Sequence, residues 1–145
     1  MTELRFTALG HPQAKGSTRA FIPRGSNRPI TTDANPRTAP WEVAIATAAH
    51  EAANGGRPVD CGVVVTLSFY FQRPRGHYGT GRNAGTLKAS APAAMTTKPD
   101  VDKLARAALD ALTGVVVADD RQVFALHARK LYGAPERLEA VIRTL

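Results

Sequence analysis

The sequence predicts an α+β domain in which a mixed β-sheet carries two helices on one of its faces. Segments rich in β-branched and aromatic residues predict several strands, whereas only two segments have the apolar spacing of a helix. Each parallel pair of strands needs a crossover, usually a helix, so two helices are too few for an all-parallel sheet. The 145 residues are expected to form a single domain, residues 1–145, around one core.

The expected elements follow one another as strand, helix, strand, helix, strand, strand. A long connection rich in Pro and Gly, residues 10–40, precedes the first helix at 41–53. The second helix is expected at 100–113, because apolar residues recur there at helical spacing between Asp100 and Gly114. These strands are expected at residues 4–9, 63–71, 123–131 and 138–145, with a further short strand at 115–117.

Four of the twelve carboxylate residues flank the second helix, with Asp100 and Asp102 at its start and Asp119 and Asp120 after it. The helix travels roughly 18 Å at about 1.5 Å per residue, and the extended segment after it covers about the same distance. If Gly114 reverses the chain, Asp119 or Asp120 returns to the helix start. Such oxygen ligands suit Mg²⁺ or Mn²⁺, although Asp also caps helices and forms polar turns.

The residues around these acids closely resemble the RusA family of Holliday junction resolvases. The chain has Asp-Val-Asp-Lys-Leu at 100–104, a helix, and Asp-Asp-Arg-Gln-Val at 119–123, where the family has Asp-x-Asp-Asn-Leu, a helix and Asp-Asp-x-Gln-Val. The resemblance implies a homodimeric, Mg²⁺-dependent endodeoxyribonuclease, with Mn²⁺ as a substitute metal, that cuts four-way DNA junctions with paired nicks during recombination and repair. The catalytic, metal-binding acids of the family fall on Asp100, Asp102 and Asp120.

Two residues depart from the pattern of the family. Lys103 stands where the family usually has Asn, and Arg106 stands where its best-known members carry a functionally important Lys. Arg106 has two interpretations. Either its guanidinium lies in the catalytic site and neutralises the scissile phosphate in the transition state, or it pairs with Asp102 and Asp110 in a surface ladder of ion pairs.

The net charge of +7 indicates an anionic partner, most economically nucleic acid. A flexible basic loop insertion at 73–98 contains no acid and ends at the acid cluster, which favours phosphate contact over a merely solvated loop. A second basic stretch lies within 10–40, but the Gly-x4-Gly-Lys-Ser/Thr spacing is absent, so no nucleotide cofactor is expected. The residues expected to contact branched DNA are Lys15, Arg19, Arg73, Arg75, Arg82, Lys88, Lys98, Lys103 and Lys130.

Two other function classes stay open on the residues alone. A non-catalytic, structure-selective DNA-binding protein would keep the basic residues, but carboxylates that face phosphates lower the affinity unless a cation lies between them. A glycosidase would need paired carboxylates across a cleft with aromatic platforms, and aromatic residues are few here. The single cysteine, Cys61, excludes an intrachain disulfide, and without a membrane-length apolar run or a signal-peptide pattern the expected location is the cytoplasm.

Overall fold

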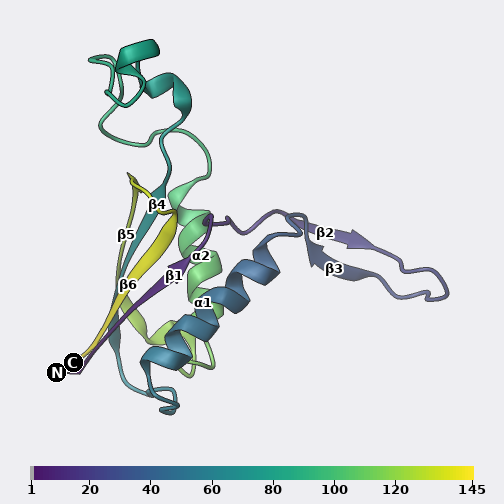
Figure 1. Ribbon diagram of the computed structural model, residues 1–145. Helices are drawn as coiled ribbons and strands as arrows, with labels where there is room; N and C mark the ends of the chain where they lie inside the picture. The colour runs from purple at the N-terminus through teal and green to yellow at the C-terminus, as the bar shows by residue number, and fades with distance from the viewer. Residues whose placement is uncertain (1) are drawn as a thin grey trace.

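The computed structural model describes residues 2–145, except for the side chains of Thr18 and Arg19. Four strands form one sheet in the order β1-β6-β4-β5, and the helices α1 (Thr38–Ala52) and α2 (Val101–Leu112) pack on the same face of it (Figure 1). The predicted α+β architecture, a mixed sheet with two helices on one face, is thus confirmed. The strands of this sheet are β1 (Glu3–Leu9), β4 (Val63–Phe71), β5 (Val123–Tyr132) and β6 (Arg137–Thr144).

Strand β4 lies inside the sheet, between β6 and β5, and it pairs with these two neighbours in opposite senses. It pairs antiparallel with β6 and parallel with β5, and β1 closes the other edge antiparallel to β6. Alternate residues of β4 from Val63 to Phe71 are buried against the helices. Helix α2 is the crossover between the parallel strands β4 and β5. It therefore starts beyond the end of β4 and finishes near the start of β5.

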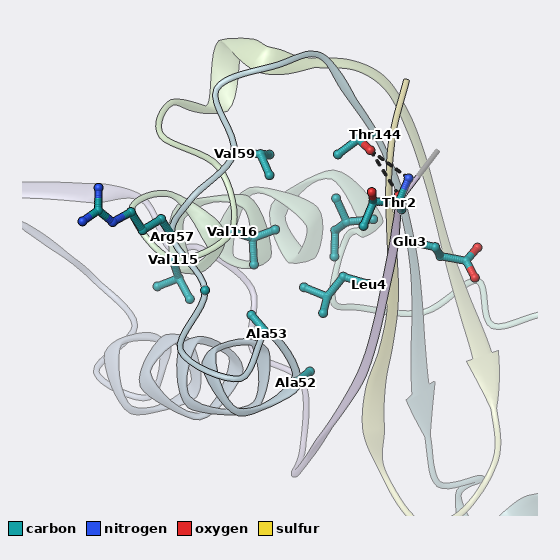
Figure 2. Close-up of a pocket in the computed structure, with 12 residues that line it drawn as sticks. Thr2, Glu3, Leu4, Ala52, Ala53, Arg57, Val59, Val115, Val116 and Thr144 are labelled. Atoms are coloured by element: carbon teal, nitrogen blue, oxygen red, sulfur yellow. Dashed lines mark hydrogen bonds between the residues drawn. The ribbon is translucent and has the colours of Figure 1, made fainter.

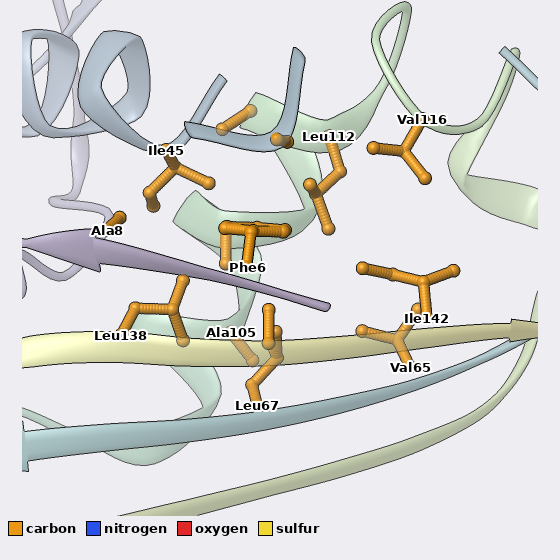
Figure 3. Packing of buried hydrophobic residues seen from close by; sticks show 14 of the residues in the cluster. Phe6, Ala8, Ile45, Val65, Leu67, Ala105, Leu112, Val116, Leu138 and Ile142 are labelled. Carbon is orange, nitrogen blue, oxygen red and sulfur yellow. The ribbon is translucent and has the colours of Figure 1, made fainter. Parts of the chain in front are cut away.

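The hydrophobic core lies between the sheet and the two helices (Figure 3). Helix α1 buries Trp41, Ile45 and Ala49, which are spaced by four residues and so share one face. Helix α2 buries Leu104 and Leu112 together with several alanines, whose small side chains let the two helices approach closely. Neither of these helices, nor any other helix in residues 2–145, has the length and apolar character needed to cross a membrane.

The segment after α2 is a turn and not the strand expected at 115–117. Gly114 has a φ of 84°, a left-handed conformation that glycine adopts without steric cost. The amides of Val115, Val116 and Val117 then all donate to the carbonyl oxygen of Leu112. The chain therefore stays beside the C-terminal end of α2 instead of running back along the helix.

The connection expected at residues 10–40 contains a two-stranded arm. Strands β2 (Thr18–Phe21) and β3 (Ile30–Asp33) pair antiparallel and project away from the sheet and helices (Figure 1). Each strand has only four residues, too few for an alternating pattern to stand out among the surrounding Pro and Gly. The sequence-based interpretation of residues 10–40 as a connection rich in Pro and Gly therefore missed these two strands.

The basic loop at 73–98 leaves the body at the end of β4 and returns to the start of α2 (Figure 1). It contains two short 3₁₀ helices, η1 (Arg75–His77) and η2 (Gly81–Asn83). Its two limbs are joined by backbone hydrogen bonds, from Lys88 N to His77 O at 2.9 Å and from Gly79 N to Thr86 O at 3.0 Å. Backbone hydrogen bonds between its two limbs therefore hold the loop together.

Candidate functional site

Asp100 and Asp102 present their carboxylates at the start of α2. Asp100 is the N-cap residue, but among the described residues its side chain accepts no capping hydrogen bond, and its nearest cation is Lys103, with Nζ 3.5 Å from Oδ2. Asp102 is exposed in the first turn and has no hydrogen bond or ion pair to any described side chain. The helix dipole favours negative charge at this end. Both carboxylates therefore keep lone pairs available for a ligand.

Lys130 of β5 holds the segment that leads into Asp100. Its Nζ donates to the carbonyl oxygen of Thr97 at 2.6 Å and to that of Pro99 at 2.9 Å. Lys130 is paired in register with Phe69 near the end of β4. Predicted as a DNA contact, Lys130 has its ammonium engaged here with the backbone that positions the acids.

Asp119 and Asp120 differ in how the structure uses them. The Asp119 carboxylate accepts a hydrogen bond from the Arg121 amide at 2.9 Å and belongs to a capping box with Gln122, at the start of the short 3₁₀ helix η3 (Asp120–Gln122). The Gln122 side chain in turn donates to the carbonyl oxygen of Val59 at 2.8 Å. Asp120 is exposed and has no hydrogen bond or ion pair within the described part of the chain. Asp120 is therefore the acid of this pair that is free to bind a ligand.

The structure does not bring Asp120 to Asp100 within one chain. Pro99, which precedes Asp100, accepts a hydrogen bond from Lys130, and Lys130 pairs with Phe69 near one end of β4. By contrast, η3 leads directly into β5, whose first residue pairs with Val63 at the other end of β4. Six residues of strand separate these ends by roughly 20 Å at about 3.3 Å per residue. Across residues 2–145, no three His, Cys, Asp or Glu side chains come close enough to hold a metal ion.

The predicted convergence of the acids in a single chain is therefore wrong, and its physical cause lies after α2. The residues following Gly114 bond back to Leu112 and do not run extended along the helix. The chain enters β5 at the far end of the sheet because β5 is parallel to β4. The assignment of Asp100, Asp102 and Asp120 as catalytic acids is a separate statement and stays a prediction.

Arg106 lies one turn after Asp102 on the exposed surface of α2. Among the residues that the structure describes, its guanidinium has no ion pair and no hydrogen bond. The surface ladder considered as its alternative is not formed, because Asp110 pairs with Lys15 instead, at 3.0 Å. Arg106 is thus, within the described part of the chain, an unpaired cation beside Asp102.

Lys15 ties the base of the arm to both helices. Its Nζ lies 2.8 Å from Glu42 Oε1 on α1 and 3.0 Å from Asp110 Oδ2 on α2, and its amide donates to Lys103 O at 3.0 Å. The hydrogen bond with Glu42 raises the pKa of Lys15, helped by the one with Asp110 and opposed by partial burial. The sequence predicts Lys15 as a DNA contact, and in the structure its charge is already matched by two carboxylates.

A pocket of about 250 Å³ separates the base of the arm from the start of α2. Lys15 and Gly16 line one side of it, and Lys98, Asp100 and Lys103 line the other. Three lysines and the Asp100 carboxylate therefore line one concave surface, although Lys15 is paired with Glu42 and Asp110, and Lys103 lies 3.5 Å from Asp100. A mixed lining of this kind is the composition expected where a phosphate and a metal ion lie side by side.

A second pocket of about 300 Å³ lies at the opposite end of the molecule, close to the chain termini (Figure 2). Leu4, Val59, Val115 and Val116 make much of its wall. None of the acids or cations predicted for the site lines it. It is therefore not the candidate active site.

The remaining predicted DNA contacts differ in how free they are. Arg73 donates to the Pro92 carbonyl oxygen at 2.7 Å, and its guanidinium lies 4.5 Å from the centre of the Tyr132 ring, so it holds the base of the basic loop. The side chain of Arg19 lies outside the described residues. Of these predicted contacts, the ones that are exposed and form no ion pair within residues 2–145 are Arg75, Arg82, Lys88 and Lys98.

Sequence reasoning missed how the start of α2 is held in place. In the sequence, Lys130 looks like any other basic residue of an alternating strand. No sequence motif indicates that Gly16 lies close to Asp33. The only sequence signal for the arm is a pair of four-residue segments, one on each side of Gly25, and each is shorter than a typical strand.

Two comparisons with known proteins cover almost the whole chain. The family model described as "Endodeoxyribonuclease RusA" matches residues 11–143. The chain is also 31% identical to the "Uncharacterized protein YqaN" of Bacillus subtilis (strain 168) over 146 residues, which cover 97% of this chain and 95% of that protein. All the acids and cations assigned to the site lie inside the segment matched by the family model.

Proposed function

The chain belongs to the RusA family of endodeoxyribonucleases, and from this premise we propose that it resolves four-way DNA junctions by metal-dependent hydrolysis of paired phosphodiester bonds. The observation that carries the proposal is the pair of exposed carboxylates of Asp100 and Asp102 at the start of α2, neither of which caps the helix, with cations around them. Acids on a surface that binds phosphates need a cation between the two charges. A purely DNA-binding protein would have no use for them.

The residues at the start of α2 fit a divalent, hard metal ion such as Mg²⁺ or Mn²⁺. The donors are carboxylate oxygens, and neither Asp100 nor Asp102 uses its carboxylate to cap the helix. When bound, such an ion lowers the pKa of a water molecule and stabilises the oxygens of an in-line displacement. Lys130 fixes the backbone before Asp100, so the donors are held in position by the fold.

We further propose that two subunits complete each metal site. One chain supplies Asp100 and Asp102 at one end of α2, while its own Asp120 lies roughly 20 Å away at the other end of β4. In a two-fold dimer, Asp120 of one subunit joins Asp100 and Asp102 of the other, and symmetry creates two equal sites. Two sites per dimer account for two nicks per junction.

The cations near the acids bind and neutralise the DNA backbone. Arg106, one turn from Asp102 and without an ion pair in residues 2–145, places a guanidinium where negative charge develops on the reacting phosphate. Lys98 and Lys103 line the pocket beside Asp100 and contact the adjoining phosphates. Arg75, Arg82 and Lys88 of the 73–98 loop extend this contact along a junction arm.

A nicking assay tests the proposed function. Synthetic four-way junctions, flaps and linear duplexes are incubated with the protein in Mg²⁺, in Mn²⁺ and in a chelator, and the products are mapped on denaturing gels. The expected result is metal-dependent, symmetric cutting of the junction and little cutting of the duplex. Tight junction binding without cutting in either metal would favour the non-catalytic DNA-binding alternative.

A further inference from the structure

The two-stranded arm, residues 18–33, ends in a group of exposed apolar side chains. Phe21 and Ile30 are directly opposite each other at the last pair of β2 and β3, and Ile22 follows in the turn. The exposed fractions of Phe21, Ile30 and Ile22 are 43%, 51% and 62%. Exposed apolar residues clustered on a projecting element mark an interaction site more often than residues scattered singly.

The charge of the arm selects the class of partner. Residues 17–32 contain Arg19, Arg24 and Arg28 and no acid. Arg24 and Arg28 lie in the exposed turn and form no ion pair with any described residue. An isolated two-stranded hairpin is marginally stable in water, so an element of this kind is stabilised by lying against a partner. Cations that border an apolar strip match a nucleic-acid groove, where phosphates border the sugars and base edges.

The base of the arm is fixed to the candidate active site. The Asp33 carboxylate accepts hydrogen bonds from the amides of Gly16 at 2.9 Å and Asn35 at 2.7 Å. A Cβ atom at Gly16 would lie 2.8 Å from the Asn35 nitrogen, so this junction has no room for a side chain. Lys15 then bonds to the Lys103 carbonyl in the first turn of α2. The arm therefore leaves the body at a defined place beside Asp100.

We propose that the arm is a β-ribbon that lies in the major groove of the junction arm being cut, with Arg24 and Arg28 on the bordering phosphates and Phe21, Ile22 and Ile30 against the sugars and base edges. The inference rests on the proposed function for the identity of the substrate. A two-stranded ribbon fits the width of the major groove. Because its base is anchored beside Asp100, the arm sets which phosphate of the bound duplex reaches the acids.

Binding measured against salt concentration separates the two kinds of contact. The measurements use the whole 145-residue chain with Asp102→Asn, so that cutting does not interfere, and a labelled four-way junction. Replacing Arg24 and Arg28 together by Gln is expected to reduce the slope of log K against log[salt] by about 0.9 for each phosphate that the variant no longer neutralises. Replacing Phe21 and Ile30 together by Ser is expected to weaken binding by roughly tenfold or more at every salt concentration, with the slope unchanged.

Two substitutions on the remote part of the surface serve as matched controls. Arg57→Gln removes an exposed cation near the termini (Figure 2), and Leu145→Ser removes an exposed apolar residue at the C-terminus. Both controls are expected to bind like the parent protein. Thermal midpoints of all variants show whether the body stays folded, which is expected because the replaced side chains are exposed.

The outcomes distinguish the arm from the proposed function. Parental affinity and salt slope in both arm variants would overturn the groove assignment, and so would a change in sedimentation state, which would assign the arm to a protein interface. Cleavage by the protein with Asp102 intact is measured separately. Arm variants that bind weakly while the intact protein cuts no DNA would sink the nuclease proposal and keep the arm as a DNA contact.

Discussion

The Lys130 ammonium donates to the carbonyl oxygen of Pro99 at 2.9 Å, which joins strand β5 to the residue that precedes the N-cap of α2. A second bond from the same ammonium reaches Thr97 O at 2.6 Å. Lys130 therefore acts on the acids through the backbone that carries them, as the residues that orient metal ligands commonly do.

Replacing Lys130 by Met tests this positioning role. The expected result is single-turnover cleavage that is ~10- to 100-fold slower and that needs a higher metal concentration. Junction affinity should fall by no more than the loss of one phosphate contact. Arg129→Met is the matched control, because Arg129 is the neighbouring residue on β5 and bonds to Ser68 instead. A large loss of affinity with an unchanged cleavage rate would instead make Lys130 a direct DNA contact.

Asp102→Asn is expected to reduce junction cleavage to background while junction binding stays equal or becomes tighter. The change removes a metal ligand and a charge that repels phosphate, at almost constant volume. Gel-shift titration and single-turnover cleavage are measured on the same preparation. Glu51→Gln, at an exposed acid of α1, is the control. Cutting at a near-normal rate by the Asp102 variant would remove this residue from the catalytic set.

Mixed dimers test whether the site is shared between subunits. A chain with Asp100→Asn and Asp102→Asn and a chain with Asp120→Asn are each expected to be inactive. Coexpressed with different tags and purified as mixed dimers, they should regain cleavage, because one of the two sites then contains all three acids. Each mixed dimer should make one nick per junction. Inactive mixed dimers would place the acids of each site in a single chain after a rearrangement, whereas an active Asp120→Asn homodimer would exclude Asp120.

Arg106→Ala is expected to lower the single-turnover rate by ~10²-fold or more, because it removes a pre-organised cation from the reacting phosphate. Arg106→Lys should restore much of the rate. The thermal midpoint should hardly move, since Arg106 is exposed and pairs with no described residue. Normal cleavage by the Ala variant at saturating metal would exclude Arg106 from the active site.

Lys15→Met tests a structural role for a residue that the sequence predicts as a DNA contact. Removal of two partly exposed ion pairs is expected to lower the free energy of unfolding by about 1 kcal/mol at neutral pH. The fold raises the pKa of Lys15 above its ordinary value of 10.5. The stabilisation is therefore fully present below this ordinary value and disappears as the pH rises through the pKa of the folded state.

Denaturant unfolding of wild type and the Lys15 variant is therefore compared at neutral and at strongly alkaline pH. The stability difference between them should shrink at alkaline pH. Lys88→Met, at an exposed lysine without an ion pair in residues 2–145, should be neutral throughout. A difference that stays constant with pH would mean that Lys15 stabilises the fold by packing and not by charge.

Much of the fold could be predicted because a helix or strand that buries one face has apolar residues at regular intervals in its sequence. The predicted strand at 63–71 coincides with β4, and the predicted helix at 100–113 exceeds α2 by one residue at each end. The arm escaped prediction because short exposed strands bury no face. The segment expected as a strand at 115–117 is a turn, in which three backbone amides donate to the Leu112 carbonyl oxygen.

The fold class, the family pattern and the surplus of positive charge can be read from the sequence alone, since each of these is carried by composition or by short-range spacing. The folded chain was needed to show that Asp120 lies at the other end of β4 from Asp100, and that Lys15 and Lys130 direct their charges to partners inside the protein. Those facts depend on which strands pair and in which direction, and on how the base of the arm packs against the two helices. Both join residues too distant in the chain for any local pattern to report.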